Sequence, residues 1–247
     1  MISKSDLKYL IPNSFTALSM ILGVISAYLS VKGELELAAW MITWGVLLDK
    51  LDGSAARLFN ASSSFGVQFD SFADFIIFGL APASLYFHWL NGLEGPYGYW
   101  PAVIACLYVV FTSTRLAIFN VSEPEGGDRY FYGLPTTLSG ATLSTLYLTW
   151  HTYWPQESGP GKLSETWQLA ILVLLGISSM MMVSRLILPK LKVRRSRLIN
   201  LFQFINIGLT YVFAPMRLFP QYLFTLCLIY LVVGFMSGAL HGVQPEE

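Results

Sequence analysis

The chain has 247 residues, of which 54% are hydrophobic and only 12% are charged, and its 15 basic residues balance its 15 acidic residues. A typical soluble domain is about 25% charged, so this composition excludes an ordinary globular protein. A net charge of zero also excludes a strongly basic domain of the kind that binds nucleic acid. The mean hydropathy of +0.55 indicates a protein of the lipid bilayer.

Eight apolar stretches predict an all-α polytopic membrane protein. Each is close to the ~20 residues that a helix needs to cross a hydrocarbon core of ~30 Å. The whole chain, residues 1–247, is then expected to form a single membrane domain. The stretches lie at residues 10–31, 36–57, 69–90, 98–120, 134–154, 166–188, 198–215 and 220–242.

The basic residues predict how these stretches are oriented. If the amino terminus lies inside, twelve of the 15 lysines and arginines fall on the inner side, and only Lys32, Lys162 and Arg217 fall on the outer side. Cytoplasmic loops carry the excess of basic residues in membrane proteins, so we expect both termini in the cytosol. The protein is therefore predicted to be integral to the cytoplasmic membrane, with about eight spans.

Two polar residues stand at the cytosolic start of the first stretch, in the segment IPNSFTALS. Asn13 and Thr16 are three residues apart, so a helix presents both side chains on one face. Asn13 is suited to capping a helix and equally to binding a ligand. The residues alone leave both interpretations open.

Four aspartates lie where the second stretch ends and the third begins. Asp49 and Asp52 are three residues apart, and Asp70 and Asp74 are four apart, so each pair shares one face of its helix. The segment NASSS between the two pairs predicts a short cytosolic loop. Two adjacent helices joined in this way bring all four carboxylates together at the cytosolic side of the membrane.

Four clustered carboxylates predict bound cations, because they cannot all stay ionised in a tight group without positive charge. Only Lys50 and Arg57 are basic in this segment. Oxygen ligands without histidine or thiolate favour Mg²⁺, Mn²⁺ or Ca²⁺ over zinc, and two such ions form the usual clamp for phosphoryl transfer. The simpler alternative is a row of solvated polar residues at the membrane surface, which would not require shared faces on two consecutive helices.

The spacing of this segment resembles a family signature. From Asp49 to Asp74 the chain reads D-x2-D-G-x2-A-R-x8-G-x3-D-x3-D, which is similar to the signature of the CDP-alcohol phosphatidyltransferases. The resemblance implies a catalytic core of six transmembrane helices over residues 8–190, followed by two additional transmembrane helices in residues 191–247. It also implies two divalent metal ions, Mg²⁺ or Mn²⁺, as cofactors.

The resemblance further implies a role for each aspartate. Asp49 and Asp70 would each contact both metals, while Asp52 would hold one metal and Asp74 the other. Asp74 would also take the proton from the incoming alcohol. A glycine permits close approach of a nucleotide, and an arginine suits a diphosphate. The residues implied in binding the CDP-diacylglycerol donor are Asn13, Thr16, Gly53, Ala56, Arg57, Ser63 and Gly66.

Two downstream segments resemble the serine-accepting branch of the family. They are TRLAIFNV at 114–121 and RYFYGLPTTLSGA at 129–141, with Ile118 where that branch commonly has a second arginine. The resemblance implies an acceptor site that contains Arg115 and Asn120. Free serine carries a carboxylate that Arg115 would bind from the cytosolic end of the fourth stretch. The alternative role for Arg115 is to anchor that end in the cytosol.

The expected reaction transfers the phosphatidyl group from CDP-diacylglycerol to the hydroxyl of serine and releases CMP, at an active site facing the cytosol. Other acceptors stay open. The basic run 185–197 either marks the lipid surface or binds the phosphate of glycerol 3-phosphate or inositol phosphate, and choline would need an aromatic or acidic cage. An ion-coupled transporter is the alternative of a different class, disfavoured because all four aspartates gather at one membrane face. The sequence leaves open whether the protein forms a homodimer.

Overall fold

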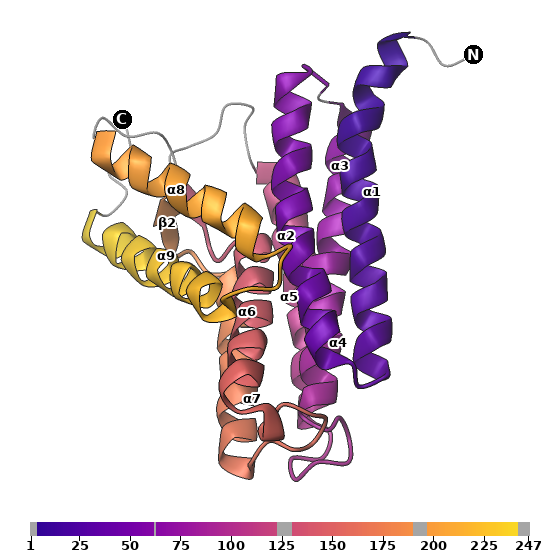
Figure 1. Cartoon of the computed structure of the whole chain (residues 1–247), viewed down its shortest axis with the longest axis vertical. Coiled ribbons are helices and arrows are strands. Elements are labelled where there is room, and N and C mark those ends of the chain that lie inside the picture. The colour runs from indigo at the N-terminus through magenta and orange to yellow at the C-terminus, as the bar shows by residue number, and fades with distance from the viewer. Residues whose placement is uncertain (1–3, 62, 123–129, 190–196, 242–247) are drawn as a thin grey trace.

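The computed structural model describes residues 4–61, 63–122, 130–189 and 197–241, and most of them are helical. Figure 1 shows a bundle of long, nearly parallel helices, with one helical hairpin lying obliquely against its side. The prediction of an all-α protein is confirmed, and the described residues add to it one short two-stranded sheet.

The first half of the chain supplies the helices that carry the aspartates. Helices α1 (Lys4–Val31) and α2 (Leu35–Leu58) are joined by a short turn and run side by side. Helix α3 (Ser64–Asp74), the π-helical stretch η1 (Phe75–Leu80) and helix α4 (Ala81–Trp89) then follow one another without a break. These three elements make one long rod that packs against α1.

The second half of the chain completes the bundle and adds the hairpin. Strands β1 and β2 pair in antiparallel fashion, with Phe131 opposite Leu188. The elements in chain order are α5 (Trp100–Ser122), β1 (Tyr130–Tyr132), α6 (Thr136–Tyr153), the 3₁₀ turn η2 (Pro155–Glu157), α7 (Glu165–Met182), β2 (Ile187–Pro189), α8 (Arg197–Phe213) and α9 (Pro220–His241).

The core of the bundle is built around the π-helical stretch. Ile77 and Phe78 are fully buried there, and glycines on two neighbouring helices leave room for them. A side chain at Gly140 of α6 would lie 2.7 Å from Phe78, and one at Gly45 of α2 would overlap Ile77. Because protein interiors are close-packed, these glycines fix how closely α2 and α6 approach the rod that carries the second aspartate pair.

Five helical segments among the described residues are long and apolar enough to cross a membrane. They are Tyr9–Val31, Ser64–Trp89, Trp100–Val121, Glu165–Met182 and Pro220–Gly238. Three predicted spans are not among them: α2 carries five charged residues, α8 has only 17 residues, and α6 has 18 residues but is also not among the five. The structure therefore supports a polytopic membrane protein, and the count of eight spans stays a prediction.

The structure corrects the bounds of two predicted stretches. Helix α7 ends at Met182 rather than continuing to residue 188, because the chain turns at Ser184 and enters β2; the Ser184 hydroxyl donates to the Met181 carbonyl at 2.8 Å. The third stretch begins at Ser64 rather than at residue 69, because the side chain of Ser63 caps the helix there.

Helices α8 and α9 are inclined to the bundle axis, and their connecting turn lies against the middle of α2 (Figure 1). The Trp44 indole N–H donates to the Ala214 carbonyl at 2.7 Å, and the Arg217 guanidinium lies 5.1 Å from the centre of the Trp44 ring. Arg217, which the charge pattern assigns to the outer side, is thus level with the middle of α2 rather than with its outer end. Most of the basic run 185–197 lies outside the described residues.

Candidate active site

Three of the four predicted metal ligands converge between α2 and α3. Asp49, Asp70 and Asp74 each offer one carboxylate oxygen, and these oxygens all lie within 4.8 Å of one another. The Asp49 and Asp74 carboxyl groups are in direct contact. The helical spacing predicted from the sequence therefore brings both aspartate pairs to one place, as expected. A donor set made only of carboxylate oxygens fits a hard divalent cation such as Mg²⁺ or Mn²⁺.

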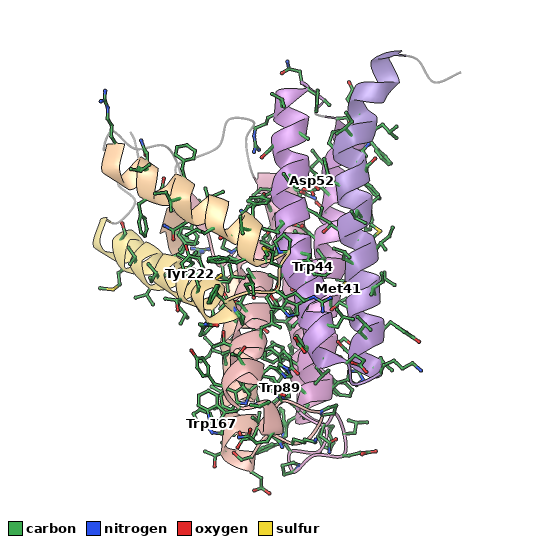
Figure 2. All side chains as sticks on the ribbon, in the orientation of Figure 1. Met41, Trp44, Asp52, Trp89, Trp167 and Tyr222 are labelled. Atoms are coloured by element: carbon green, nitrogen blue, oxygen red, sulfur yellow. The ribbon has the colours of Figure 1, made fainter. Side chains whose placement is uncertain are left out.

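The fourth aspartate, Asp52, lies beside this cluster and is fixed by α1. Its side chain is only 6% exposed, and its Oδ2 accepts a hydrogen bond of 2.8 Å from the Thr16 hydroxyl. The Thr16 hydroxyl also contacts the Pro12 carbonyl within its own helix at 3.1 Å. Thr16 was predicted to contact the donor, and the structure adds that it orients a metal-ligand candidate. Figure 2 shows Asp52 between the upper parts of α2 and α1.

A cavity of about 210 Å³ opens between α1, α2 and α3, next to the aspartate cluster. All seven residues predicted to bind the donor line it, together with Asp52 and Asp70. The cavity is open on one side, so it can hold part of a larger ligand whose remainder lies outside. The full lining is Pro12, Asn13, Thr16, Asp52, Gly53, Ala56, Arg57, Ala61, Ser63, Gly66, Val67 and Asp70.

The loop and first turn of α3 shape the floor of this cavity. The Ser63 hydroxyl accepts a hydrogen bond of 3.0 Å from the Gly66 backbone N–H, as an N-cap residue does. A side chain at Gly66 would lie 3.2 Å from the Ser63 hydroxyl and 3.6 Å from the Asn13 amide oxygen. Because Gly66 has no side chain, the polar atoms of Ser63 and Asn13 stay accessible from the cavity.

Arg57 lies in the last turn of α2 and lines the cavity. Its Nη2 donates to the Ser54 hydroxyl at 3.4 Å, and its Nη1 lies 3.6 Å from where a side chain on Gly53 would begin. A hydrogen bond of this length is weak, so the planar donor fork can turn towards an anion in the cavity.

The two predicted acceptor residues lie on α5, outside the cavity lining. Arg115 is only 7% exposed, and its guanidinium lies 5.6 Å from the centre of the Phe119 ring. The Asn120 side-chain N–H donates to the Ser71 hydroxyl at 2.8 Å. Since Ser71 lies in the helical turn between Asp70 and Asp74, Asn120 ties the end of α5 to the turn that carries two metal-ligand candidates.

Sequence reasoning missed two residues that touch this machinery. Ser71 binds Asn120, as described, and Thr137 contacts the Asp49 carboxylate from the first turn of α6. Thr137 follows the GLP segment, and polar side chains in a first helical turn commonly point at the helix end. The position of Thr137 in a first helical turn was therefore the available signal of a functional role. Nothing in the sequence indicated that this end of α6 lies beside α2.

The start of α6 is held in place by the end of α7. Gly133 adopts a φ of 72°, and its N–H donates to the Leu186 carbonyl at 2.6 Å. A side chain at Gly133 would meet the carbonyl oxygens of Met181, Met182 and Ser184. Only glycine therefore fits this turn, which delivers Thr137 to Asp49.

Comparisons with known proteins agree with this arrangement. The family model for CDP-alcohol phosphatidyltransferase matches residues 9–236. A CDP-diacylglycerol–serine O-phosphatidyltransferase of Helicobacter pylori (strain ATCC 700392 / 26695) is 35% identical over 205 residues, which cover 83% of this chain and 82% of that protein. An archaetidylserine synthase of Methanothermobacter thermautotrophicus is 35% identical over 147 residues, 56% of this chain and 58% of that one.

The family match includes both aspartate pairs, the cavity lining and most of the α8–α9 hairpin. Together with the converging carboxylates and the adjoining cavity, it shows that the chain belongs to the CDP-alcohol phosphatidyltransferase family.

Proposed function

We propose that this protein transfers the phosphatidyl group of CDP-diacylglycerol to the hydroxyl of L-serine, producing phosphatidylserine and CMP. The observation that carries this proposal is the cavity lined by all seven predicted donor residues, directly beside three converging carboxylates. The names of the relatives in Helicobacter pylori and Methanothermobacter thermautotrophicus support serine as the acceptor.

The donor side of the reaction rests on two groups of residues. Asp49, Asp52, Asp70 and Asp74 would hold two divalent cations, whose charge would neutralise the donor diphosphate. Gly53 and Arg57 line the cavity. Gly53 leaves space for the nucleotide, and the guanidinium of Arg57 donates paired hydrogen bonds to phosphate oxygens. The acyl chains would stay in the lipid.

The acceptor side uses a carboxylate as base. Asp74 would take the proton from the serine hydroxyl. As the serine oxygen forms its bond to the phosphorus that bears diacylglycerol, the bond from this phosphorus to the bridging oxygen breaks, and CMP leaves with that oxygen. Arg115 would bind the serine carboxylate with its donor fork, and Asn120 would support the acceptor site through its bond to Ser71.

The proposed setting follows from the charge pattern. Eight spans with both termini in the cytosol put the aspartates at the cytosolic face of the cytoplasmic membrane. Serine and CMP are water-soluble, and a cytosolic active site gives both direct access to the cavity. A homodimer is compatible with this arrangement.

An acceptor panel tests the proposal. Purified protein in lipid nanodiscs is supplied with CDP-diacylglycerol, Mg²⁺ or Mn²⁺, and one acceptor at a time: serine, glycerol 3-phosphate, inositol phosphate or choline. We expect CMP release and a new phospholipid with serine alone, and loss of both in excess chelator. Faster turnover with glycerol 3-phosphate would refute the serine assignment, and no CMP release with any acceptor would favour the ion-coupled transporter.

A further inference from the structure

The α8–α9 hairpin, residues 197–241, contacts α2 at the turn that precedes the first aspartate. We infer that this hairpin holds α2 in the position that metal binding requires, and that Tyr211 is a positioning residue for Asp49. The inference rests on the proposed metal site. It assigns a task to two helices that lie outside the expected six-helix catalytic core.

The first contact lies where the hairpin turn meets α2. The Trp44 indole N–H donates to the carbonyl of Ala214 at 2.7 Å, and Ala214 is fully buried. The Arg217 guanidinium covers the Trp44 ring at 5.1 Å, within the range of a cation–π interaction. Figure 2 shows Trp44 at the place where the end of α8 reaches α2. The hairpin is thus attached to α2 by a directed hydrogen bond as well as by a cation–π contact.

The second contact lies one helical turn closer to the metal ligands. The Tyr211 hydroxyl donates to the Leu47 carbonyl at 3.3 Å. Leu47 precedes Asp49 by two residues, and the Asp49 carboxylate is near enough to interact electrostatically with the Tyr211 hydroxyl. Tyr211 therefore holds the backbone of the turn from which Asp49 projects.

The third observation concerns the support of Asp49 from its other sides. Thr137 contacts its carboxylate from α6, and the Thr43 hydroxyl donates to the Ser144 hydroxyl at 3.2 Å, also from α6. Tyr211 adds the contact from the hairpin. A metal ligand must be held within about 0.5 Å of its productive position. Movement of the backbone at Leu47 would therefore displace the Asp49 carboxylate from the metal site.

The hairpin also contains a matched control. The Tyr222 hydroxyl of α9 donates to the Asn206 side-chain oxygen of α8, which joins the two helices of the hairpin to each other and not to α2. Tyr211→Phe and Tyr222→Phe each remove one hydroxyl and one hydrogen bond from the same hairpin. Only the first removes a bond to α2, so the pair separates the positioning of Asp49 from the general packing of the hairpin.

The experiment measures direct Mn²⁺ binding to the full-length protein in nanodiscs by calorimetry, with thermal unfolding in chelator as the stability readout. Groups that support metal ligands typically affect metal affinity by 10–100-fold. Because Tyr211 acts through the backbone, we expect about a tenfold weaker Mn²⁺ affinity in Tyr211→Phe, at the lower end of that range. Trp44→Phe, which loses the bond to Ala214, should change the affinity in the same direction. Tyr222→Phe should bind Mn²⁺ like the wild type, although it unfolds at a similarly lowered temperature.

Unchanged Mn²⁺ affinity in Tyr211→Phe would overturn the inference, and so would an equal loss in Tyr222→Phe. A wild-type protein that binds no Mn²⁺ would overturn it together with the metal site. If the wild type binds Mn²⁺ and the variants behave as expected, but no phosphatidyl group reaches serine, the proposed reaction fails and the inference about the hairpin stands.

Discussion

At the scale of single residues, the most informative contrast is between Arg57 and Arg115. Arg57 lines the cavity and forms a weak hydrogen bond within its own helix, whereas Arg115 is buried on α5 beside Phe119. The two arginines thus lie in different surroundings, one at the cavity and the other on α5. In the proposed reaction the first binds the donor and the second binds the acceptor.

This difference predicts the effect of replacing each arginine by lysine, which keeps the charge but loses the planar fork. Arg115→Lys should raise the KM for serine and leave the KM for CDP-diacylglycerol unchanged. A charge-assisted hydrogen bond contributes about 1.5–3 kcal/mol, which corresponds to about a ten- to more than a hundredfold change. Steady-state kinetics with each substrate varied in turn provides the measurement.

Arg57→Lys is the control, and it should raise the KM for the donor instead. Serinol lacks the carboxylate of serine, so it should be a poor acceptor for the wild type and little affected by Arg115→Lys. A folded Arg115→Lys protein with an unchanged KM for serine would remove Arg115 from the acceptor site.

Residue-level prediction from the sequence succeeded where the relevant spacing lies within one segment. Helical geometry alone places Asp49 with Asp52 and Asp70 with Asp74, because residues three or four apart share a face. It does not place Thr137, which is 88 positions along from Asp49, the difference of their residue numbers. The contact between these two residues depends on how α6 packs against α2, and no local pattern encodes that.

At the scale of elements, the start of α6 depends on a backbone position that only glycine fits. Gly133 has a positive φ, and three carbonyl oxygens, two in the last turn of α7 and one at Ser184 just after it, surround the place of its missing side chain. The turn at Gly133 leads into the helix that brings Thr137 to Asp49. The GLP segment, which resembles the serine-accepting branch of the family, thus also positions Thr137 beside the candidate site.

Gly133→Ala should therefore destabilise the protein and weaken metal binding. Left-handed backbone costs an L-residue about 1–2 kcal/mol, and forcing extra atoms into a packed site typically costs about 1–3 kcal/mol more. Gly98 offers the matched control, since its φ is 54° but nothing lies within 4 Å of an added side chain. Gly98→Ala should show only the backbone cost in thermal unfolding. Equal losses in the two variants would mean that the carbonyl groups of Met181, Met182 and Ser184 do not confine Gly133.

At the scale of the whole molecule, the bundle has two distinct ends. The aspartates and the cavity lie at one end, while the loop from Asn91 to Tyr99 and the η2 turn lie at the other. The long helices were predictable from the sequence, because each contains an apolar stretch close to the length that a helix needs to cross a membrane. The sequence did not predict the oblique course of α8 and α9, because apolar residues pack at many angles. The hydrogen bonds from Trp44 to Ala214 and from Tyr211 to Leu47 join segments that are far apart in the sequence.

The orientation of these two ends in the membrane can be measured with single cysteines. Leu58 at the aspartate end is 77% exposed, and Leu93 at the opposite end is 62% exposed. In a protein whose Cys106 and Cys227 are replaced by alanine, an impermeant maleimide applied outside intact cells should label Leu93→Cys and spare Leu58→Cys. Permeabilised cells should show both labelled, which controls for reactivity. The reverse pattern in intact cells would place the aspartates on the outer side.

The π-helical stretch Phe75–Leu80 has a consequence for how this chain is compared with other sequences. A π turn closes its hydrogen bonds over five residues instead of four, so it takes up an additional residue without a break in the helix. In an α-helix each added residue rotates everything beyond it by about 100°, from 3.6 residues per turn. If one residue were added here without a π turn, the fully buried Tyr86 and Trp89 would rotate away from the core while Asp70 and Asp74 stayed in place. A family member that is α-helical throughout this rod therefore needs one residue fewer between its last aspartate and its buried aromatics, and a sequence alignment should carry its single-residue gap within these six positions.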